Sequence, residues 1–384
     1  MTRVAIFIDD FSATGVVVNS IAIARRLLER GCVVQMIASQ AEGALIGTVP
    51  EGVTVVGLLP ADRAGSARPG RLRRSLPEFR RRLREFAPDV LFSAGNHGHL
   101  ASALASLGLP KCRIVVRISN DLDHMIDGKP VKPYSRWWRI LKFRTVAMFA
   151  DKLVFVSPHL VRSEKVLGRG GIRKAVVIPN GVDAGAVRER ARDEVSHEWL
   201  SNTAEQPLVL AVGRLAGQKN FENLLRAIAH ARRTRPLRLL LIGSGPLESA
   251  LREQAASLGI ALDVDFMAPV PNPIPFIAGA SVLALPSWWE GSSNVLLEAL
   301  ACGTPILASR TAGSAEDVLD HGRYGVLVDP GDPVAMGEGL LRQIGGDVRL
   351  PGDRALAFSR DAALDAYVDL ILREESAPSG GSRA

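Results

Sequence analysis

The sequence predicts an α/β protein made of two doubly wound domains, each with a parallel sheet, that face each other across a cleft. The chain has 384 residues, more than one ordinary hydrophobic core accommodates. Short apolar runs alternate with segments of helical periodicity, an order typical of strand–helix–strand units. The turn cluster Pro179-Asn-Gly-Val-Asp183 and a polar stretch up to about residue 206 divide this alternation into two series.

The first series predicts a domain over residues 1–183. Strands are expected at residues 3–9, 33–38, 53–56, 90–93, 114–118, 152–157 and 175–178. A loop at 10–15 and a helix at 17–30 separate the first two strands. Gly31 is expected to end that helix, because glycine adopts the left-handed conformation common just after a helix.

The second series predicts a domain over residues 184–353. Strands are expected at residues 208–212, 237–242, 264–267, 281–285, 305–308 and 326–328. Helices are expected at 221–233, with Asn220 as the N-cap, at 247–258 and at about 294–301. A last helical pattern, at about 354–373, is expected to cross back onto the first domain, and the Ser-, Gly- and Pro-rich tail 374–384 to be disordered.

Composition limits the possible environments. The three cysteines, Cys32, Cys112 and Cys302, lie far apart, which argues for a reducing compartment and against a disulfide framework. The N-terminus is charged too early for a signal peptide, and no apolar run approaches the roughly 18 residues that a membrane helix needs. We therefore expect a cytoplasmic protein.

The chain is basic, with a formal net charge of +7, so phosphorylated ligands, nucleic acid and anionic membranes are candidate partners. Two basic segments stand out: residues 63–84, bounded by Arg63 and Arg84, and residues 132–144, bounded by Lys132 and Arg144. The second segment has no acid and contains Trp137 and Trp138, a mixture that favours peripheral contact with the inner face of the cell membrane. No nucleic-acid recognition motif accompanies the charge.

Charged residues follow the strands of the second series, where open parallel sheets bind ligands. Arg214 follows the strand 208–212, and Lys219 precedes a helix N-terminus, so both could contribute to an anion site for a diphosphate. Glu290 follows the strand 281–285, and Glu298 comes eight residues later. Carboxylates repel phosphate but accept hydrogen bonds from hydroxyls. The combination therefore fits a sugar nucleotide, in which a diphosphate separates a hexose from a ribose.

The run Ser287-Trp-Trp-Glu-Gly-Ser-Ser-Asn-Val-Leu-Leu-Glu298 resembles the E-x7-E signature of the retaining glycosyltransferases of family 4 (GT4, group 1). Three further segments resemble segments of that family in the same order: Ile178-Pro-Asn-Gly-Val-Asp183, Gly213-Arg-Leu-Ala-Gly-Gln-Lys-Asn220 and Leu241-Ile-Gly-Ser-Gly-Pro-Leu247. The resemblance implies the GT-B fold, with two Rossmann-like domains. Residues 1–183 would bind the acceptor, and residues 184–353 would bind the nucleotide-sugar donor.

The resemblance also implies roles for single residues of the second domain. Glu290 would hold hydroxyls of the donor hexose and Glu298 those of the ribose, while Arg214 and Lys219 would stabilise the leaving diphosphate. Donor contacts are further implied for Gly291, Ser292, Ser293, Asn294 and Val295. No metal or other cofactor is expected, since the two cations would replace a metal. Asp121-Leu-Asp123 has a metal-binding spacing but lies in the wrong domain for the donor.

In the first domain, Gly15 resembles a glycine of the family's first loop, which approaches the diphosphate and the acceptor. The segment Ser93-Ala-Gly-Asn-His-Gly-His99 resembles a region that holds a functional histidine near the reacting sugar. His97 is favoured over His99 for this role. The chain departs from the family's pattern after Glu290, where Gly291-Ser292-Ser293 stands, and this leaves the identity of the donor open.

These observations predict transfer of a hexosyl or N-acetylhexosaminyl group, with retention, from a nucleoside-diphosphate sugar, with UDP favoured. The acceptor is expected to be a glycan or lipid-linked glycan in polysaccharide, lipopolysaccharide or glycoprotein assembly. Three alternatives stay open: a nucleotide-sugar epimerase on the same fold, a non-catalytic nucleotide-sugar-binding scaffold, and a basic protein that binds lipid or nucleic acid.

Overall fold

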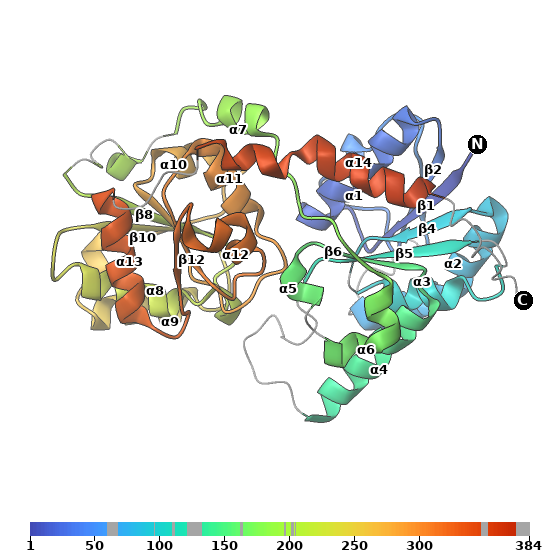
Figure 1. The fold of residues 1–384 in the computed structure, drawn as a ribbon, viewed down its shortest axis with the longest axis horizontal. Helices are drawn as coiled ribbons and strands as arrows, with labels where there is room; N and C mark the ends of the chain where they lie inside the picture. The colour runs from blue at the N-terminus through green and yellow to red at the C-terminus, as the bar shows by residue number, and fades with distance from the viewer. Residues whose placement is uncertain are drawn as a thin grey trace, which may run out of the picture.

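The computed structural model describes residues 1–59, 68–95, 97–109, 112–120, 133–161, 164–195, 197–200, 203, 205–346 and 352–373. It has two lobes, each built on one sheet (Figure 1). The tail 374–384, the Asp121-Leu-Asp123 segment and the residues Arg63 and Lys132 lie outside this part of the chain.

The N-terminal sheet has seven parallel strands in the order β3-β2-β1-β4-β5-β6-β7. Its strands are β1 (Arg3–Ile8), β2 (Val33–Ala38), β3 (Thr54–Gly57), β4 (Val90–Ser93), β5 (Arg113–Ile118), β6 (Lys152–Phe155) and β7 (Ala175–Val177). The helices of this half are α1 (Gly15–Glu29), α2 (Arg68–Phe86), α3 (His99–Ala105), α4 (Pro133–Phe149), α5 (Pro158–Val161) and α6 (Glu164–Arg173). The strand order reverses between β1 and β4.

The C-terminal sheet has six parallel strands in the order β10-β9-β8-β11-β12-β13. Its strands are β8 (Leu208–Val212), β9 (Arg238–Ile242), β10 (Val264–Met267), β11 (Val282–Leu285), β12 (Ile306–Ser309) and β13 (Val326–Val328). The remaining helices are α7 (Ala184–Arg190), α8 (Phe221–Ala231), α9 (Glu248–Ser257), α10 (Ile274–Gly279), α11 (Asn294–Cys302), α12 (Ala315–Val318), α13 (Pro333–Gly345) and α14 (Arg360–Leu372). Here the strand order reverses between β8 and β11.

The predicted fold class is confirmed, because both sheets are parallel and carry helices between successive strands. The central strands are apolar on both faces: five of the six residues of β1 are buried, and so are four of the five of β8. Strands covered by helices on both faces need such continuous apolar runs. Separate apolar clusters on the two faces of the C-terminal sheet show the same arrangement, one beside α10 and α11 and the other beside α8 and α13.

Three local predictions were wrong. The first helix begins at Gly15 rather than at residue 17. Asn220 precedes α8 but does not cap it: its backbone is left-handed (φ 57°), and its side-chain amide donates to the carbonyl oxygens of Pro286 and Pro330. The last helix begins only at Arg360, where the Ser359 side chain accepts from the Ala362 amide, and a 3-10 segment, Gly352–Phe358, precedes it.

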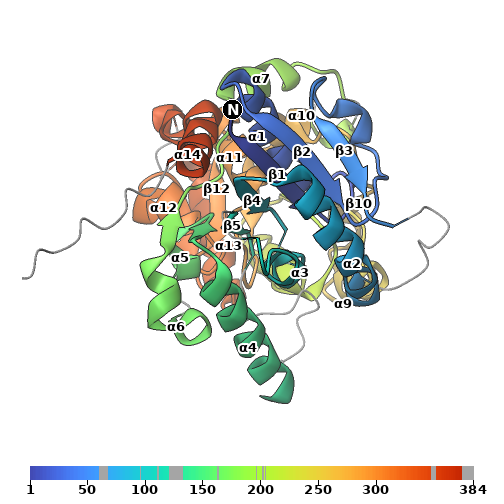
Figure 2. The same cartoon turned by 90° about the vertical axis from the view of Figure 1, so that its right-hand side faces the viewer.

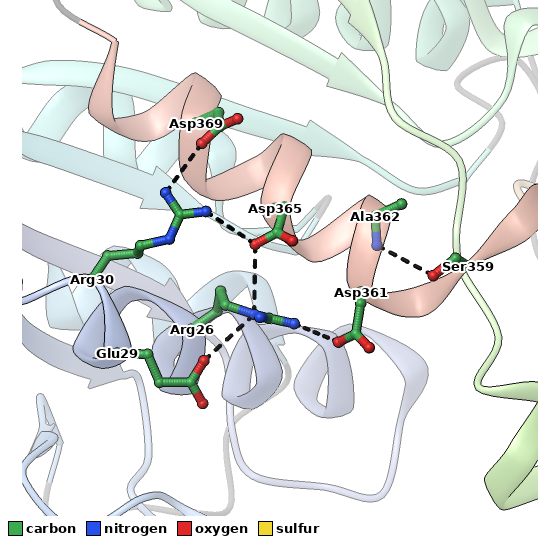
Figure 3. A network of polar contacts seen from close by, with 8 residues as sticks. All are labelled: Arg26, Glu29, Arg30, Ser359, Asp361, Ala362, Asp365 and Asp369. Atoms are coloured by element: carbon green, nitrogen blue, oxygen red, sulfur yellow. Dashed lines mark hydrogen bonds and ion pairs between the residues drawn. The ribbon is translucent and has the colours of Figure 1, made fainter.

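Helix α14 lies against α1 of the N-terminal lobe, although the chain reaches it from the C-terminal lobe (Figures 1 and 2). Its buried Tyr367, Val368 and Ile371 belong to the N-terminal core. On the exposed side, Arg26 and Arg30 of α1 face Asp361, Asp365 and Asp369, which are spaced at four residues along α14 (Figure 3). Residues four apart share one helix face, so a row of charges supports the apolar contact.

The described residues include no helix that is both long and apolar enough to cross a bilayer.

His99, at the start of α3, is a core residue rather than a lining of the cleft. Its side chain is fully buried, and Nδ1 lies 2.9 Å from the Ser93 hydroxyl at the end of β4. The Ser102 hydroxyl donates to Ser93 over 2.9 Å, which leaves the Ser93 proton for His99. Burial, together with the nearby charge of Lys142, lowers the pKa of His99 to about 3. The imidazole is therefore neutral in the folded protein.

This burial predicts an acid sensitivity that depends on His99. The unfolded chain binds a proton on this histidine below a pKa of about 6.5, whereas the folded chain does so only near pH 3, so stability falls as the pH drops below about 6.5. Between pH 7 and pH 5, urea unfolding should show that the wild type loses about 2 kcal/mol more stability than His99→Gln. Equal losses in the two proteins would contradict the buried, neutral state.

Candidate functional site

Loops at the carboxyl ends of the two sheets meet between the lobes, and we refer to the region around this contact as the cleft. Ligands in open parallel sheets bind where the strand order reverses, at the carboxyl ends of the strands. The loop after β11 reaches the loop after β5: a Cβ atom on Gly291 would lie 1.9 Å from the carbonyl oxygen of Ser119. Only glycine permits this approach. The cleft thus lies between loops that already touch at one point.

Glu290 and Lys219 form an ion pair on the C-terminal side of the cleft. Oε1 of Glu290 lies 2.6 Å from Nζ of Lys219 and accepts a 2.8 Å hydrogen bond from the Ser287 hydroxyl. Glu290 is only 8% exposed. A Cβ on Gly213 would come within 2.9 Å of the Lys219 side chain, so that glycine leaves room for the lysine. Lys219 was expected as a cation for the diphosphate, but its ammonium is already shared with the carboxylate.

Arg214 has a different environment from Lys219. It is exposed and lines a hollow of about 430 Å³ at the ends of β8 and β9, together with Gly213, Gly243 and Gly245. Within the described part of the chain, no carboxylate forms an ion pair with it. Arg214 is therefore the cation available to a bound anion. The glycines bring the two loops together, since a Cβ on Gly243 would lie 1.9 Å from the Gly213 oxygen.

Glu298 lies in the second turn of α11, away from the Lys219 pair. Burial raises the pKa of its carboxyl group, and the charge of Arg190 on α7 opposes this shift. Among the described residues, no side chain forms a hydrogen bond or ion pair with it. A half-buried carboxylate without donors has acceptor capacity for the hydroxyls of a ligand, and the ribose contact of Glu298 stays a prediction.

The other C-terminal residues that were predicted to contact the donor lie in the loop before α11 and in its first turn. The Ser293 side chain, at the N-cap position, makes no capping hydrogen bond, so first-turn N–H groups stay available to a ligand. Ser292 accepts a 3.4 Å hydrogen bond from Ser314. Asn294 begins the helix and is exposed, while Val295 is half-buried beside the C-terminal core. The five consecutive residues that were predicted to contact the donor, 291–295, thus lie in this loop and at the start of α11.

On the N-terminal side, a hollow of about 310 Å³ lies at the ends of β1, β4 and β5. Its lining includes Asp9, Asp10, Thr14, His97, Gly98 and Asn120. The structure therefore places His97 on the wall of the cleft and His99 in the core. Gly15 starts α1, and a Cβ there would lie 3.2 Å from the Asn294 side chain, so the N-termini of α1 and α11 meet.

Several residues of the site escaped the sequence interpretation. Asp9 and Asp10 were not singled out, although two acids directly after the first strand were a usable signal. Ser287 lay inside the E-x7-E run, but only the structure shows that it orients Glu290. Within the described ranges, no group of three or more His, Cys, Asp or Glu side chains is placed to hold a metal ion.

Two family models match adjoining parts of the chain. The model described as Glycosyltransferase Family 4 matches residues 13–185, and the one described as Glycosyl transferases group 1 matches residues 206–345. Together they cover both lobes and include the E-x7-E run.

Curated relatives give a consistent result. The chain is 32% identical over 229 residues to the lipopolysaccharide core biosynthesis glycosyltransferase LpsE of Rhizobium meliloti, which covers 58% of this chain and 64% of LpsE. It is 33% identical over 201 residues to a GDP-mannose-dependent alpha-(1-6)-phosphatidylinositol monomannoside mannosyltransferase of Mycolicibacterium smegmatis, covering 49% of this chain and 52% of the relative. The matched region thus spans between half and two thirds of these relatives.

Solved structures show the same fold at low identity. HepE of Anabaena, crystallised with UDP, superposes with a TM-score of 0.72 at 19% identity, over 96% of this chain and 99% of HepE. WaaG, a glycosyltransferase involved in lipopolysaccharide biosynthesis, superposes with a TM-score of 0.68 at 16% identity, over 97% of this chain and 100% of WaaG. With the two family matches and this fold, the chain belongs to the group 1, family 4 glycosyltransferases of the GT-B fold.

Proposed function

We propose that the protein transfers a hexosyl or N-acetylhexosaminyl group from a nucleoside-diphosphate sugar to an acceptor hydroxyl, with retention and without a metal. The observation that carries the proposal is the layout of one edge of the C-terminal sheet. There Arg214 lines a glycine-lined hollow, and the Glu290–Lys219 pair lies beside Gly213 of the same hollow. Glu298, on the helix that follows the Glu290 loop, has a carboxylate to which no described side chain donates. The C-terminal domain is then the donor domain.

The charges suggest how the glycosidic bond is weakened. Negative charge grows on the diphosphate as the bond to the sugar breaks, and preorganised cations stabilise it most in the transition state. Arg214 and the first-turn N–H groups of α11 supply such stabilisation directly. Lys219 does so while it holds Glu290 for the hexose hydroxyls. Because no carboxylate is proposed as a nucleophile, retention implies attack of the acceptor on the same face that the diphosphate leaves.

UDP is the favoured nucleotide, although relatives differ in this respect. HepE was crystallised with UDP, whereas the Mycolicibacterium smegmatis relative is named for GDP-mannose. The hollow beside His97 across the cleft gives room for an acceptor, which an epimerase or a nucleotide-sugar scaffold does not need. This feature favours transfer over those two alternatives.

Donor binding can be tested by thermal unfolding with UDP-, GDP- and ADP-sugars in the presence of EDTA. A ligand at 100 times its Kd stabilises the native state by about 2.7 kcal/mol, so one donor class should raise the melting temperature. Glu298→Ala should lose most of this rise, while Glu338→Ala, an exposed control on α13, should keep it. No rise with any donor, or a rise that requires Mg²⁺, would refute the proposed site or its metal independence.

We further propose that the acceptor is a glycan, in particular a lipid-linked glycan, presented at an anionic membrane on the cytoplasmic side. A second hollow of about 310 Å³ adjoins the first through His97 and is lined mainly by Leu72, Leu76, Leu100 and Leu104. Arg73 and Lys142 also line it, a combination that suits an apolar chain with an anionic head group. A Campylobacter jejuni relative, 29% identical over 67% of its length, is named for a diphospho-undecaprenol acceptor.

Helix α4 is the proposed membrane contact, and it projects at the lower edge of the molecule (Figure 2). Trp137 and Trp138 on it are 58% and 62% exposed. The wild type should therefore sediment with phosphatidylglycerol-containing vesicles at low salt, and less so at high salt. Trp137→Ser/Trp138→Ser should bind several-fold more weakly, while Leu262→Ser, at an exposed apolar site on the other lobe, should not. Equal sedimentation with neutral vesicles, or no effect of the tryptophans, would refute this surface.

A further inference from the structure

A buried arginine that the proposed reaction does not use lies beneath the cleft. Arg117, on β5, is 2% exposed. Its Nε donates to the Tyr367 hydroxyl of α14 over 3.0 Å, and its Nη2 donates to Oδ1 of Asn180 over 2.8 Å. No carboxylate of the described chain forms an ion pair with it. A buried guanidinium held only by neutral acceptors is costly, so its position needs a reason.

The polar contacts continue from Asn180 into the donor domain. Nδ2 of Asn180, in the segment that joins the two sheets, donates to Oδ1 of Asn294 over 3.0 Å. Asn294 is the first residue of α11, directly after the loop that carries Glu290. Its side chain also lies against Gly15, at the start of α1. One chain of hydrogen bonds thus runs from α14 through Arg117 and Asn180 to Asn294, at the end of the loop 286–293 that carries Glu290. We call this loop the donor loop.

We propose that Arg117 is a positioning residue: acting through Asn180, it holds Asn294 and the first turn of α11 against the N-terminal domain. This contact fixes the donor loop relative to the acceptor side, as transfer between two ligands bound to different domains requires. The inference rests on the proposed function, since its main readout is turnover of a sugar nucleotide. UDP is expected to bind even when this chain of contacts is broken, because Arg214 and Glu298 take no part in it.

The shape of arginine explains why this residue is used. A planar guanidinium presents several N–H donors in a fixed fork, and here two of them reach acceptors on separate segments. Lysine keeps the charge but has no such fork. Arg117→Lys therefore separates geometry from charge. If Arg117 positions Asn180, the lysine variant should lose activity. If the role of Arg117 is purely electrostatic, the variant should retain activity.

Arg113 provides a matched control on the same strand. It lies four residues before Arg117 and donates to the backbone carbonyls of Ile371 and Arg373, at the C-terminal end of α14. Arg113→Lys weakens attachment of α14 without touching Asn180. If Arg117 served only to attach that helix, the two substitutions would have similar effects on catalysis.

The experiment compares wild type, Arg117→Lys, Asn180→Ala and Arg113→Lys in three measurements. They are the melting temperature, the Kd for UDP by calorimetry, and kcat for release of nucleoside diphosphate from the donor that the melting panel selects, with water as acceptor. Arg117→Lys and Asn180→Ala should lower kcat by about 10- to 100-fold, because small misplacements of reacting groups cost that much. Their Kd for UDP should stay within about twofold of wild type, and Arg113→Lys should keep the wild-type kcat.

Each contrary result has a clear meaning. A wild type that neither binds nor turns over a donor refutes the proposed function itself. Positioning through Asn180 is refuted if the wild type is active but Asn180→Ala has the same kcat as Arg113→Lys. It is also refuted if Arg117→Lys keeps the wild-type kcat. A joint fall of kcat, UDP affinity and melting temperature would show a merely structural role. Should Arg117→Lys not fold, Asn180→Ala decides alone, since it leaves the arginine and Tyr367 in place.

Discussion

The ion pair between Lys219 and Glu290 sets the chemistry of the cleft. The Glu290 carboxylate is nearly buried, and one of its oxygens lies 2.6 Å from the Lys219 ammonium and 2.8 Å from the Ser287 hydroxyl. In the proposed function, the pair holds this carboxylate as an acceptor for sugar hydroxyls, and the exposed Arg214 serves as a cation for the diphosphate.

The fold places this pair where two ligands can meet. The strand order of each sheet reverses at the cleft, so the loops that carry Lys219, Glu290 and His97 all lie at carboxyl ends of strands. Gly291 lets the donor loop touch the backbone after β5, and the contacts of Arg117, Asn180 and Asn294 join the same two regions. Helix α14, held on α1 by an apolar core and a row of ion pairs, anchors the far end of that chain of contacts (Figure 3).

The sequence was sufficient for the sheets because strands buried on both faces are continuous apolar runs, and β2, β4, β8, β10 and β13 have the predicted bounds. It failed where tertiary contacts compete with local preference. Asn220 looks like a cap, but the carbonyls of Pro286 and Pro330 take its amide. The Lys219–Glu290 pair joins residues 71 apart, and Arg117 is one of the two arginines in the otherwise apolar strand β5. No local pattern reveals either contact.

The most direct test of the central claim is a double-mutant cycle on kcat/KM for the donor with Lys219→Gln, Glu290→Gln and the double variant. If the pair acts as one unit, each single substitution should cost nearly as much as both together, because either one leaves the other partner buried and unmatched. The coupling energy would then be on the order of 1–3 kcal/mol. Additive losses would show that the two side chains act independently and would contradict this account of the cleft.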